Sequence, residues 1–467
     1  MKFLRIIWVV PLDDRITKLG EGDINIPIAD YIHHISRLAL VCYFLPCYAD
    51  EVVTKKAQLM GDTRLQPCVS EISGMSKVVW LPYSPDAIVV SEMLSLSRFP
   101  GSDTAEHVQH DWSPRRYLQL ALERLKRECL LDILVGFETE FILLQNIVDE
   151  HGYDTYVPIE TSAYCQTTGF DTVADVIRDM CTVLQAHGHQ QVLHCHGESA
   201  NGQYEIVTGY GDALTQADDF ILRKELIQHV ARTHGLVVSF LPKLFQDQAG
   251  TASHVHISLV PTSDTDRVEL DDHGLSIHLS RFIAGLIDNM QALVLLTAGS
   301  PNSSKRLLDG AWAGSWSCWG FDNKEAPLRV IDRNHVEYKA FDGTVNPYLA
   351  MTAILCAGLD GISRGQCAPG PVTGDPSVLD SKPVTCTRLP QSLDESILFF
   401  SENRTRMETD GSGMISEWYR AVCSDGGIPK KALDEFLHDF CATKEAEAEY
   451  FSSKSFEEEV DILRLRY

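Results

Sequence analysis

The most constraining feature of the chain is a pair of glutamates inside an otherwise apolar stretch, ILVGFETEFILL, at residues 133–144. The β-branched and aromatic residues predict a strand, and side chains alternate across a strand, so Glu138 and Glu140 share one face. Two neighbouring carboxylates on a buried strand repel each other and are costly to desolvate. A fold that buries this strand therefore needs a cation between them.

More acidic and imidazole side chains gather in three later segments, HCHGESANGQYEI, SHVHISL and NHVEYKAFDG, which contain His194, His196, Glu198, Glu205, His254, His256 and Glu337. Several glutamates with one histidine form a hard, oxygen-rich ligand set that suits Mg²⁺ or Mn²⁺ rather than zinc. A cluster of this charge also suits two divalent ions that bridge phosphates. Each glutamate taken alone is more typical of a surface or salt-bridged carboxylate.

The charge balance and the cysteines limit the partners and the compartment. The chain has 40 Lys and Arg against 65 Asp and Glu, a net charge of −25, which disfavours a nucleic-acid partner. Its 13 cysteines include no C-x-x-C pair and are typical of buried thiols in a reducing compartment. Residues 3–10 are too short for a signal peptide, and no apolar run reaches the roughly 18 residues that span a membrane. We therefore expect a cytoplasmic protein without a membrane partner.

Strands and helices alternate irregularly along the chain, which predicts an α+β fold rather than a doubly wound sheet. A polar stretch over 97–114 separates a strand-rich beginning from the rest, so we predict one domain over 1–105 and a second over 106–467. Ser113 and Pro114 have the residue types that begin a helix. The other predicted elements are strands over 4–10, 77–83 and 254–260, helices over 170–188, 346–362 and 430–451, and a Pro/Gly-rich loop over 365–384.

The order of the motifs resembles the glutamine synthetase family. E-x-E in a strand is followed by H-x-E-x(3)-G-Q-x-E, G-x(3)-H-x-H, N-S-x-K-R and a late E-x-[RK] before N-P-Y-L, between about residues 114 and 362. The chain has no phosphate loop and no G-x-G-x-x-G motif, so another design must bind any nucleotide. The resemblance, closest to type I enzymes, implies a small β-grasp domain followed by a catalytic domain with a curved antiparallel sheet and surrounding helices. It also implies ATP as co-substrate and a ring-shaped homo-oligomer with sites between subunits.

The resemblance further implies two metal ions, Mg²⁺ or Mn²⁺, in one funnel. One ion would be held by Glu140, Glu198 and Glu205, and the other by Glu138, His254 and Glu337. A bend at Gly202 would let the two glutamates on either side of it converge on their metal. His194 and His196 would then be structural or supporting side chains.

Five further positions carry substrate roles by resemblance. Arg306 would bind the α-carboxylate of a glutamate-like acid through a bidentate pair, and Gly250 would let the backbone approach its amino group. Arg329 would face the phosphates, while His256 and Ser258 would lie on the nucleotide side. An ordinary ion pair is the alternative interpretation of both arginines.

The chain departs from the family pattern mainly at positions that would bind or deprotonate the amine substrate. Where the family has a flap glutamate that accepts a proton from ammonium, this sequence has Trp312, which can still stack on an organic cation. Lys324 and Lys339 replace phosphate- or carboxylate-facing arginines, and His335 replaces a third; lysine keeps the charge but loses the planar fork. The aspartate loop that a neighbouring subunit donates in the family is not recognisable, and Asp62 is a poor candidate for it.

These departures affect the amine more than the metals or ATP, because all six predicted metal ligands are present. We therefore predict an ATP-dependent ligase that activates the γ-carboxylate of glutamate, or of a similar acid, as an acyl phosphate. The acyl phosphate would condense with an amine larger than ammonia. Two alternatives stay open at this point: an ordinary glutamine synthetase that uses ammonia, and a non-catalytic structural or regulatory member of the family.

Overall fold

The computed structural model describes residues 113–467 except 149–150, 153, 187–190, 263–268, 380–385, 425–426 and 465–466, together with four N-terminal strands. The chain divides into two compact units, Met1–Arg116 and Tyr117–Tyr467. In the first unit β1 (Leu4–Val10) pairs antiparallel with β2 (Ala39–Leu45), and β3 (Val69–Ser70) with β4 (Val79–Trp80). The predicted strand over 4–10 is confirmed. The β-grasp fold and the boundary near residue 105 involve residues outside this description and stay predictions.

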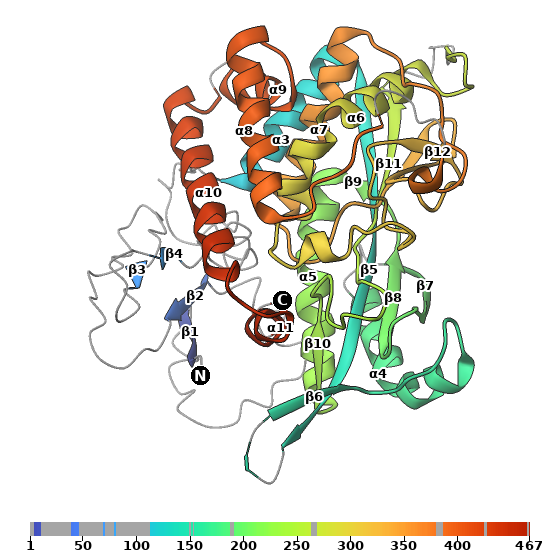
Figure 1. Cartoon of the computed structure of the whole chain (residues 1–467), viewed down its shortest axis with the longest axis vertical. Coiled ribbons are helices and arrows are strands. Elements are labelled where there is room, and N and C mark those ends of the chain that lie inside the picture. Colours follow the sequence, from blue (N-terminus) through green and yellow to red (C-terminus); the bar gives the residue numbers. More distant parts are fainter. Residues whose placement is uncertain are drawn as a thin grey trace. The chain divides into compact units, whose positions relative to one another are not determined.

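A ten-stranded sheet forms the framework of the larger unit (Figure 1). In path order its strands are β12 (Trp319–Phe321), β13 (Leu328–Asp332), β14 (His335–Tyr338), β11 (Val255–Pro261), β5 (Leu131–Val148), β8 (Gln203–Thr208) and β7 (Val192–Gly197). The long strand β5 also pairs with β6 (Asp154–Pro158), β9 (Gly211–Asp212) and β10 (Leu236–Ser239). Sheet and helices together make the fold α+β, as predicted.

The prediction of a wholly antiparallel sheet is wrong at one edge, because β12 and β13 run parallel. The chain reverses twice between them, over residues 322–327. Asp322 adopts a left-handed φ of 45°, and the Asn323 amide donates to the backbone oxygens of Val372 and Gly374 at 2.9 and 2.8 Å. This side-chain anchoring lets a short connection return the chain in its original direction.

The helices surround the sheet. They are α3 (Pro114–Cys129), α4 (Thr167–Ala186), α5 (Ala213–Thr233), α6 (Ile277–Thr297), α7 (Pro347–Arg364), α8 (Leu393–Asp410), α9 (Met414–Cys423), α10 (Lys430–Phe451) and α11 (Phe456–Leu463). Short 3-10 turns lie at Ser303–Lys305 and Pro376–Val378. Figure 1 shows α6, α7, α8 and α9 grouped together, whereas α5 runs beside β5.

Helix starts follow the sequence signals. Ser113 Oγ accepts a hydrogen bond from the backbone N–H of Arg116 at 3.3 Å, so the predicted serine cap of α3 is confirmed. The Asn346 side chain accepts from the N–H groups of Tyr348 and Leu349, and Pro347 occupies the first turn of α7. These caps satisfy backbone donors that have no partner inside the helix.

Strand β5 has two chemically different faces. On one face, the Phe137 ring lies 4.8 Å from that of Phe220 on α5, and Arg223 donates to Thr139 Oγ1 at 3.0 Å. Glu138 and Glu140 alternate with these residues and belong to the opposite face. The predicted alternation is confirmed, and α5 covers the face without the glutamates.

Helices α6 and α7 form the centre of the helical layer. Among the described residues, α6 alone is long and apolar enough to cross a membrane by length and composition, and 83% of its apolar window is buried inside the fold. Gly285 on α6 faces Gly361 on α7 with backbone against backbone: a Cβ at Gly285 would lie 2.1 Å from the Ala357 carbonyl oxygen. The two helices can approach this closely because neither glycine has a side chain.

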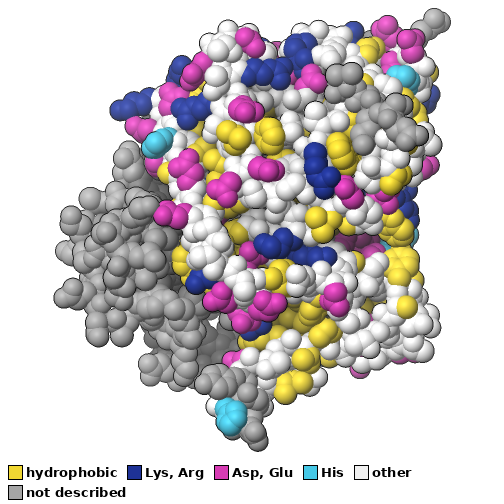
Figure 2. Space-filling view, in the orientation of Figure 1, with side chains coloured by type: hydrophobic (Ala, Val, Ile, Leu, Met, Phe, Trp, Pro, Cys, Tyr) yellow, Lys and Arg dark blue, Asp and Glu magenta, His cyan; other side chains and the backbone are white. Residues whose placement is uncertain are grey.

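The charged surface and the cysteines of the described residues agree with what the composition predicts. On the face in Figure 2, acidic and basic side chains are interspersed over the described residues rather than separated into patches. A basic stripe of the kind that tracks a nucleic-acid backbone is not seen on this described face. The ten cysteines in the described part of the chain are all free thiols.

We predict that Gly285→Ala destabilises the protein by about 1–3 kcal/mol, because the added methyl group forces two packed backbones apart. Urea unfolding monitored by fluorescence measures the change. The matched control is Gly370→Ala, where a built Cβ meets nothing within 4 Å. Equal unfolding midpoints for the two variants would contradict the close-packing argument.

Candidate active site

Strand register brings acidic and basic side chains from distant parts of the chain together. Glu140 on β5 lies opposite Glu205 on β8. Glu337 on β14 lies opposite His256 on β11 and also opposite Arg329 on β13. The sheet therefore aligns groups from four separate sequence motifs on neighbouring strands.

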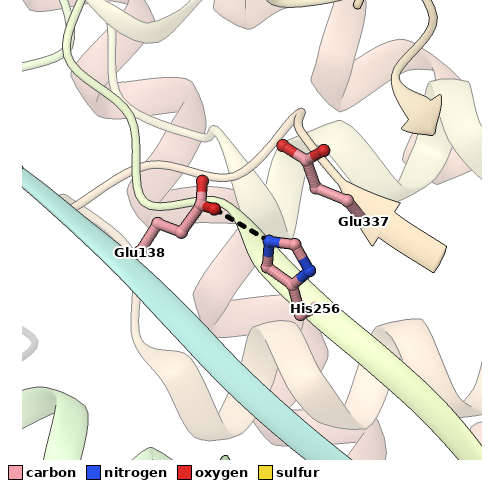
Figure 3. Close-up of side chains that lie close together, drawn as sticks. All are labelled: Glu138, His256 and Glu337. Carbon is pink, nitrogen blue, oxygen red and sulfur yellow. Dashed lines mark hydrogen bonds and ion pairs between the residues drawn. The ribbon is translucent and has the colours of Figure 1, made fainter. Parts of the chain in front are cut away.

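One cluster centres on Glu138. His254 Nδ1 lies 3.0 Å from Glu138 Oε2 and 3.2 Å from Glu337 Oε1. His256 Nε2 lies 2.9 Å from Glu138 Oε1, and Figure 3 shows Glu138, His256 and Glu337 pointing toward one another from β5, β11 and β14. Each of these three residues offers a ligand atom within 4.8 Å of the others. Sequence reasoning placed His256 on the nucleotide side; the structure also places it against Glu138.

The charges in the Glu138 cluster are mutually dependent. Burial opposes the charged form of His254, but its hydrogen bonds to Glu138 and Glu337 outweigh this effect and raise its pKa to about 10. Burial likewise favours neutral Glu337, yet the His254 hydrogen bond lowers the pKa of Glu337 to about 2. The pKa of Glu138 lies well below its usual value, despite burial, because both histidines hydrogen-bond to it. The cluster thus stabilises positive charge between two carboxylates.

A second cluster forms around the bend between β7 and β8. His196 lies 3.4 Å from a carboxylate oxygen of Glu198 and 3.4 Å from one of Glu205, and the three residues offer ligand atoms within 4.8 Å of one another. Gly202 has a φ of +66°, and a Cβ there would lie 2.8 Å from the Leu143 carbonyl oxygen. The predicted bend is confirmed, and only glycine fits it without strain.

Like charges dominate this second cluster. Burial, followed by the charge of Glu140, raises the pKa of Glu198 to about 7. Burial and the charges of Glu138 and Glu140 raise the pKa of Glu205 to about 9. Carboxylates that repel one another in this way are the donor set that a hard divalent cation neutralises, so the residues fit Mg²⁺ or Mn²⁺.

Gln203 is a site residue to which the sequence reasoning gave no role. Its Nε2 donates to Glu140 Oε2 at 2.7 Å and to the Gly250 carbonyl oxygen at 3.0 Å. The Ala252 N–H donates to the same Glu140 oxygen at 2.9 Å. Gln203 thus fixes the orientation of Glu140 and connects β8 to the Gly250 loop. Its place in the G-Q-x-E motif was the available signal.

The Arg306 guanidinium is buried beside Gly250. Its Nη2 donates to the carbonyl oxygens of Lys339 and Phe341 at 3.1 and 3.2 Å, while its buried Nε has no hydrogen-bond partner among the described residues. A Cβ on Gly250 would lie 2.4 Å from Arg306 Cγ, so the glycine makes room for the arginine stem. A buried guanidinium with an unused donor fits an anionic ligand.

The predicted nucleotide-side residues lie along β11, β13 and β14. His256 Nδ1 is 2.8 Å from His335 Nε2, and Ser258 pairs with His335 in the strand register. Burial and the neighbouring His256 lower the pKa of His335. Arg329 donates to Glu337 Oε2 at 3.2 Å. Tyr210, which sequence reasoning missed, is 72% exposed, and its Cβ would lie 3.3 Å from a Cβ on Gly136.

The residues on the predicted amine side also form one group. The Lys324 Nζ lies 5.0 Å from the centre of the Trp312 ring, and Lys339 Nζ donates to the Lys324 carbonyl oxygen at 2.6 Å. Glu325, which the sequence reasoning missed, lies near Trp312: the N–H groups of Trp312 act to lower its pKa, although burial and Asp375 raise it overall. A carboxylate is therefore present next to the position where the flap glutamate is missing.

Two predicted positions do not join these clusters in the described residues. His194 is exposed on β7, two residues before His196. Asp62 lies outside the described residues, so the partner-donated aspartate stays untested. Tyr164 joins the second cluster instead: its ring centre is 6.3 Å from that of His196, and burial and Glu198 raise its pKa to about 12.

Comparison with known proteins places this geometry in a family. The model of the glutamine synthetase catalytic domain matches residues 111–425. The type-1 glutamine synthetase 1 of Dictyostelium discoideum is 27% identical over 456 residues, which cover 93% of this chain and 88% of that protein. The gamma-glutamylpolyamine synthetase GlnA3 of Streptomyces coelicolor is 32% identical over 277 residues, 56% of this chain and 58% of that protein.

A solved structure of a GmaS–ADP complex superimposes with a TM-score of 0.62 at 27% identity, covering 77% of this chain and 79% of that one. The family match extends over well more than half of the chain and includes every cluster described above. The chain therefore belongs to the glutamine synthetase family, whose members are ATP-dependent ligases that use divalent metal ions.

Proposed function

We propose that this ligase joins the γ-carboxylate of glutamate, or of a similar acid, to an amine larger than ammonia. The observation that carries the proposal is Trp312, which is 53% exposed at the position of the family's flap glutamate and has a cation over its ring. An indole cannot accept a proton from ammonium, but it binds the apolar body or the positive charge of an organic amine. The name of the Streptomyces relative, gamma-glutamylpolyamine synthetase, agrees with this substrate class.

Two divalent cations, Mg²⁺ or Mn²⁺, would bind at the two carboxylate clusters. The proposed ligands are Glu140, Glu198 and Glu205 for one ion and Glu138, His254 and Glu337 for the other. His196 and His256 lie close enough to serve each cluster as well. Divalent ions supply charge neutralisation for phosphate oxygens, which is most of what phosphoryl transfer requires.

The acid and the nucleotide would bind around Glu337. Arg306 and Lys339 are buried cations that would hold the acid's carboxylates. Arg329, His256, Ser258 and His335 would face the nucleotide, with exposed Tyr210 available to stack on a nucleoside. Lys324 would reach the phosphates. An oxygen of the acid's γ-carboxylate would attack the γ-phosphorus of ATP and ADP would leave, which gives an acyl phosphate, a better electrophile than a carboxylate.

An ordinary glutamine synthetase is the second candidate, and Glu325 is the observation that favours it. Its carboxylate lies near Trp312 and could replace the missing flap glutamate as proton acceptor. A ring-shaped homo-oligomer with intersubunit sites and a cytoplasmic location complete the proposal.

The substrate class can be measured by phosphate release from ATP with Mg²⁺ or Mn²⁺, glutamate, and either ammonia, hydroxylamine or a panel of alkyl amines. We expect kcat/KM for the best organic amine to exceed that for ammonia by about tenfold or more, as side-chain recognition in a pocket allows. Glu337→Gln should abolish release with every amine. Ammonia as best substrate would establish the ordinary enzyme, and ATP binding without release would establish a non-catalytic protein.

Glu205→Gln should stabilise the metal-free protein at pH 8 by about 1–3 kcal/mol. Because the pKa of Glu205 is about 9 in the fold and 4.5 without it, the folded state retains a proton that the unfolded chain releases. Stability from this group is thus full below pH 4.5 and falls as the pH rises toward 9. Glu205→Gln does not suffer this pH-dependent loss of stability. Because the variant also lacks the negative charge that would bind the metal ion, Mn²⁺ should raise its melting temperature less than that of the wild type.

Thermal unfolding with and without Mn²⁺ measures both effects of Glu205→Gln. The control is Glu402→Gln, an exposed carboxylate on α8. Equal Mn²⁺ stabilisation of Glu205→Gln and the wild type would rule out Glu205 as a ligand.

Trp312→Glu should raise kcat/KM for ammonia by about tenfold or more, since it restores a proton acceptor beside the incoming nucleophile. Phosphate release with ammonia is the measurement. Trp316→Glu is the control because Trp316 also donates its indole N–H to a carboxylate, Asp309 Oδ1, at 3.0 Å. An unchanged or lower ammonia rate in Trp312→Glu would contradict the explanation of the flap.

A further inference from the structure

The backbone at Trp312 is strained in a way that exposes the indole. Trp312 has a left-handed φ of 53°, which is uncommon for a large side chain, and its residue remains 53% exposed. Gly314 anchors the segment after it, because a Cβ there would lie 2.5 Å from the backbone nitrogen of Pro327. A strained conformation held by its surroundings is a common property of ligand-binding positions.

Glu325 lies close to the exposed indole. The N–H groups of Trp312 and the charge of Lys339 act to lower its pKa, whereas burial and the charge of Asp375 raise it, and the net shift is upward. A ligand ammonium beside Glu325 would offset both the burial and the repulsion from Asp375.

A cation already lies on the indole. The Lys324 Nζ is 5.0 Å from the centre of the Trp312 ring, so this face binds an ammonium group. Lys324 and Glu325 are consecutive residues, and the ammonium and the carboxylate therefore contact the same indole from one short segment.

This group lies beside the proposed acid site. Lys339 Nζ donates to the Lys324 carbonyl oxygen at 2.6 Å, and Arg306 Nη2 donates to the Lys339 carbonyl oxygen at 3.1 Å. Lys339 is two residues from Glu337 on the same chain segment. An amine that attacks an activated acid between Arg306 and Lys339 can thus extend toward Trp312.

We propose that Trp312, Lys324 and Glu325 form a subsite for the distal ammonium group of a diamine, which displaces the Lys324 ammonium from the indole face. The inference rests on the proposed function and specifies its amine. Once the diamine has displaced it from the indole face, the Lys324 ammonium can bind phosphate oxygens. Diamine binding and phosphate binding therefore favour the same placement of the Lys324 side chain. The net charge of −25 also favours encounter with a doubly charged amine.

The chemistry requires two nitrogens in different protonation states. The attacking nitrogen must be neutral, because its lone pair forms the new C–N bond. The C–O bond to phosphate then breaks, and its electron pair leaves with the phosphate. The surplus proton on the attacking nitrogen passes to solvent. The distal nitrogen stays protonated throughout. The indole face and the Glu325 carboxylate bind that ammonium, which a monoamine of the same length lacks.

The test compares 1,4-diaminobutane with 1-aminopentane, in which a methyl group replaces the distal ammonium, on the full chain, by kcat/KM from phosphate release. We expect the wild type to prefer the diamine by about tenfold or more, since cation–π and charged contacts each contribute about two- to thirtyfold. Trp312→Ala and Glu325→Gln should reduce this ratio at least fivefold, mainly through KM, and Trp312→Phe should be intermediate. Because the diamine-to-monoamine ratio of kcat/KM is measured within each variant, a general loss of active protein does not change it.

Trp316 provides the matched control. Its ring has Arg388 at 5.5 Å from the centre, and its indole N–H donates to Asp309, so it repeats the indole, cation and carboxylate arrangement on a neighbouring segment. Trp316→Ala should leave the diamine ratio at the wild-type value. A ratio that falls equally in Trp316→Ala and Trp312→Ala would overturn the proposal.

Calorimetric titration of 1,4-diaminobutane keeps the subsite testable if turnover is absent. No phosphate release with any amine overturns the proposed function, and the titration then decides the subsite alone. Binding that weakens at least fivefold in Glu325→Gln and Trp312→Ala supports the subsite. Turnover with monoamines at least as efficient as with diamines, or diamine binding unaffected by both substitutions, overturns it while leaving the proposed ligase activity intact.

Discussion

Repulsion among buried carboxylates is the constraint on which the site depends. Strand β5 places Glu138 and Glu140 on one face, and register with β8 adds Glu205 opposite Glu140. The other face of β5 packs Phe137 against α5, so the strand cannot rotate to expose its glutamates without exposing this core. The fold therefore fixes the acidic groups together and makes a bound cation favourable.

The same environment divides the carboxylates into two electrostatic types. Glu138 and Glu337 border His254, and hydrogen bonds to its imidazole keep their pKa values low. Glu198 and Glu205 border mainly other carboxylates, and burial with this repulsion raises their pKa values. The two clusters therefore differ in how strongly their carboxylates repel one another.

Local sequence signals predicted much of this arrangement. The alternation of Glu138 and Glu140, the serine cap of α3 and the bend at Gly202 depend on dihedral angles and side-chain periodicity within a few residues, and all three are confirmed. That the separate motifs meet in one site was predicted from the family resemblance alone. Strand pairing between segments far apart in the chain leaves no local signal in the sequence.

The features that sequence reasoning missed are contacts across the fold. Gln203 reaches Glu140 and Gly250 through hydrogen bonds, and Glu325 lies near Trp312. Sheet register and loop packing set these partners. The parallel pairing of β12 and β13 has the same origin, since Asn323 is anchored to residues about fifty positions later in the chain. No periodicity or spacing encodes such partners.

The segment between β12 and β13 explains how the amine side can differ while the metal clusters persist. It provides Lys324 and Glu325 to Trp312, receives the Lys339 ammonium through the Lys324 carbonyl, and ends in the strand that contains Arg329. It is anchored through the Asn323 amide to the backbone oxygens of Val372 and Gly374. Under the proposed function, substitutions in this segment would change which nucleophile is bound while the glutamates on β5 and β8 keep their strand positions. A change at Lys324 would then affect both the indole and the phosphates, which would couple amine selection to nucleotide binding through a single side chain.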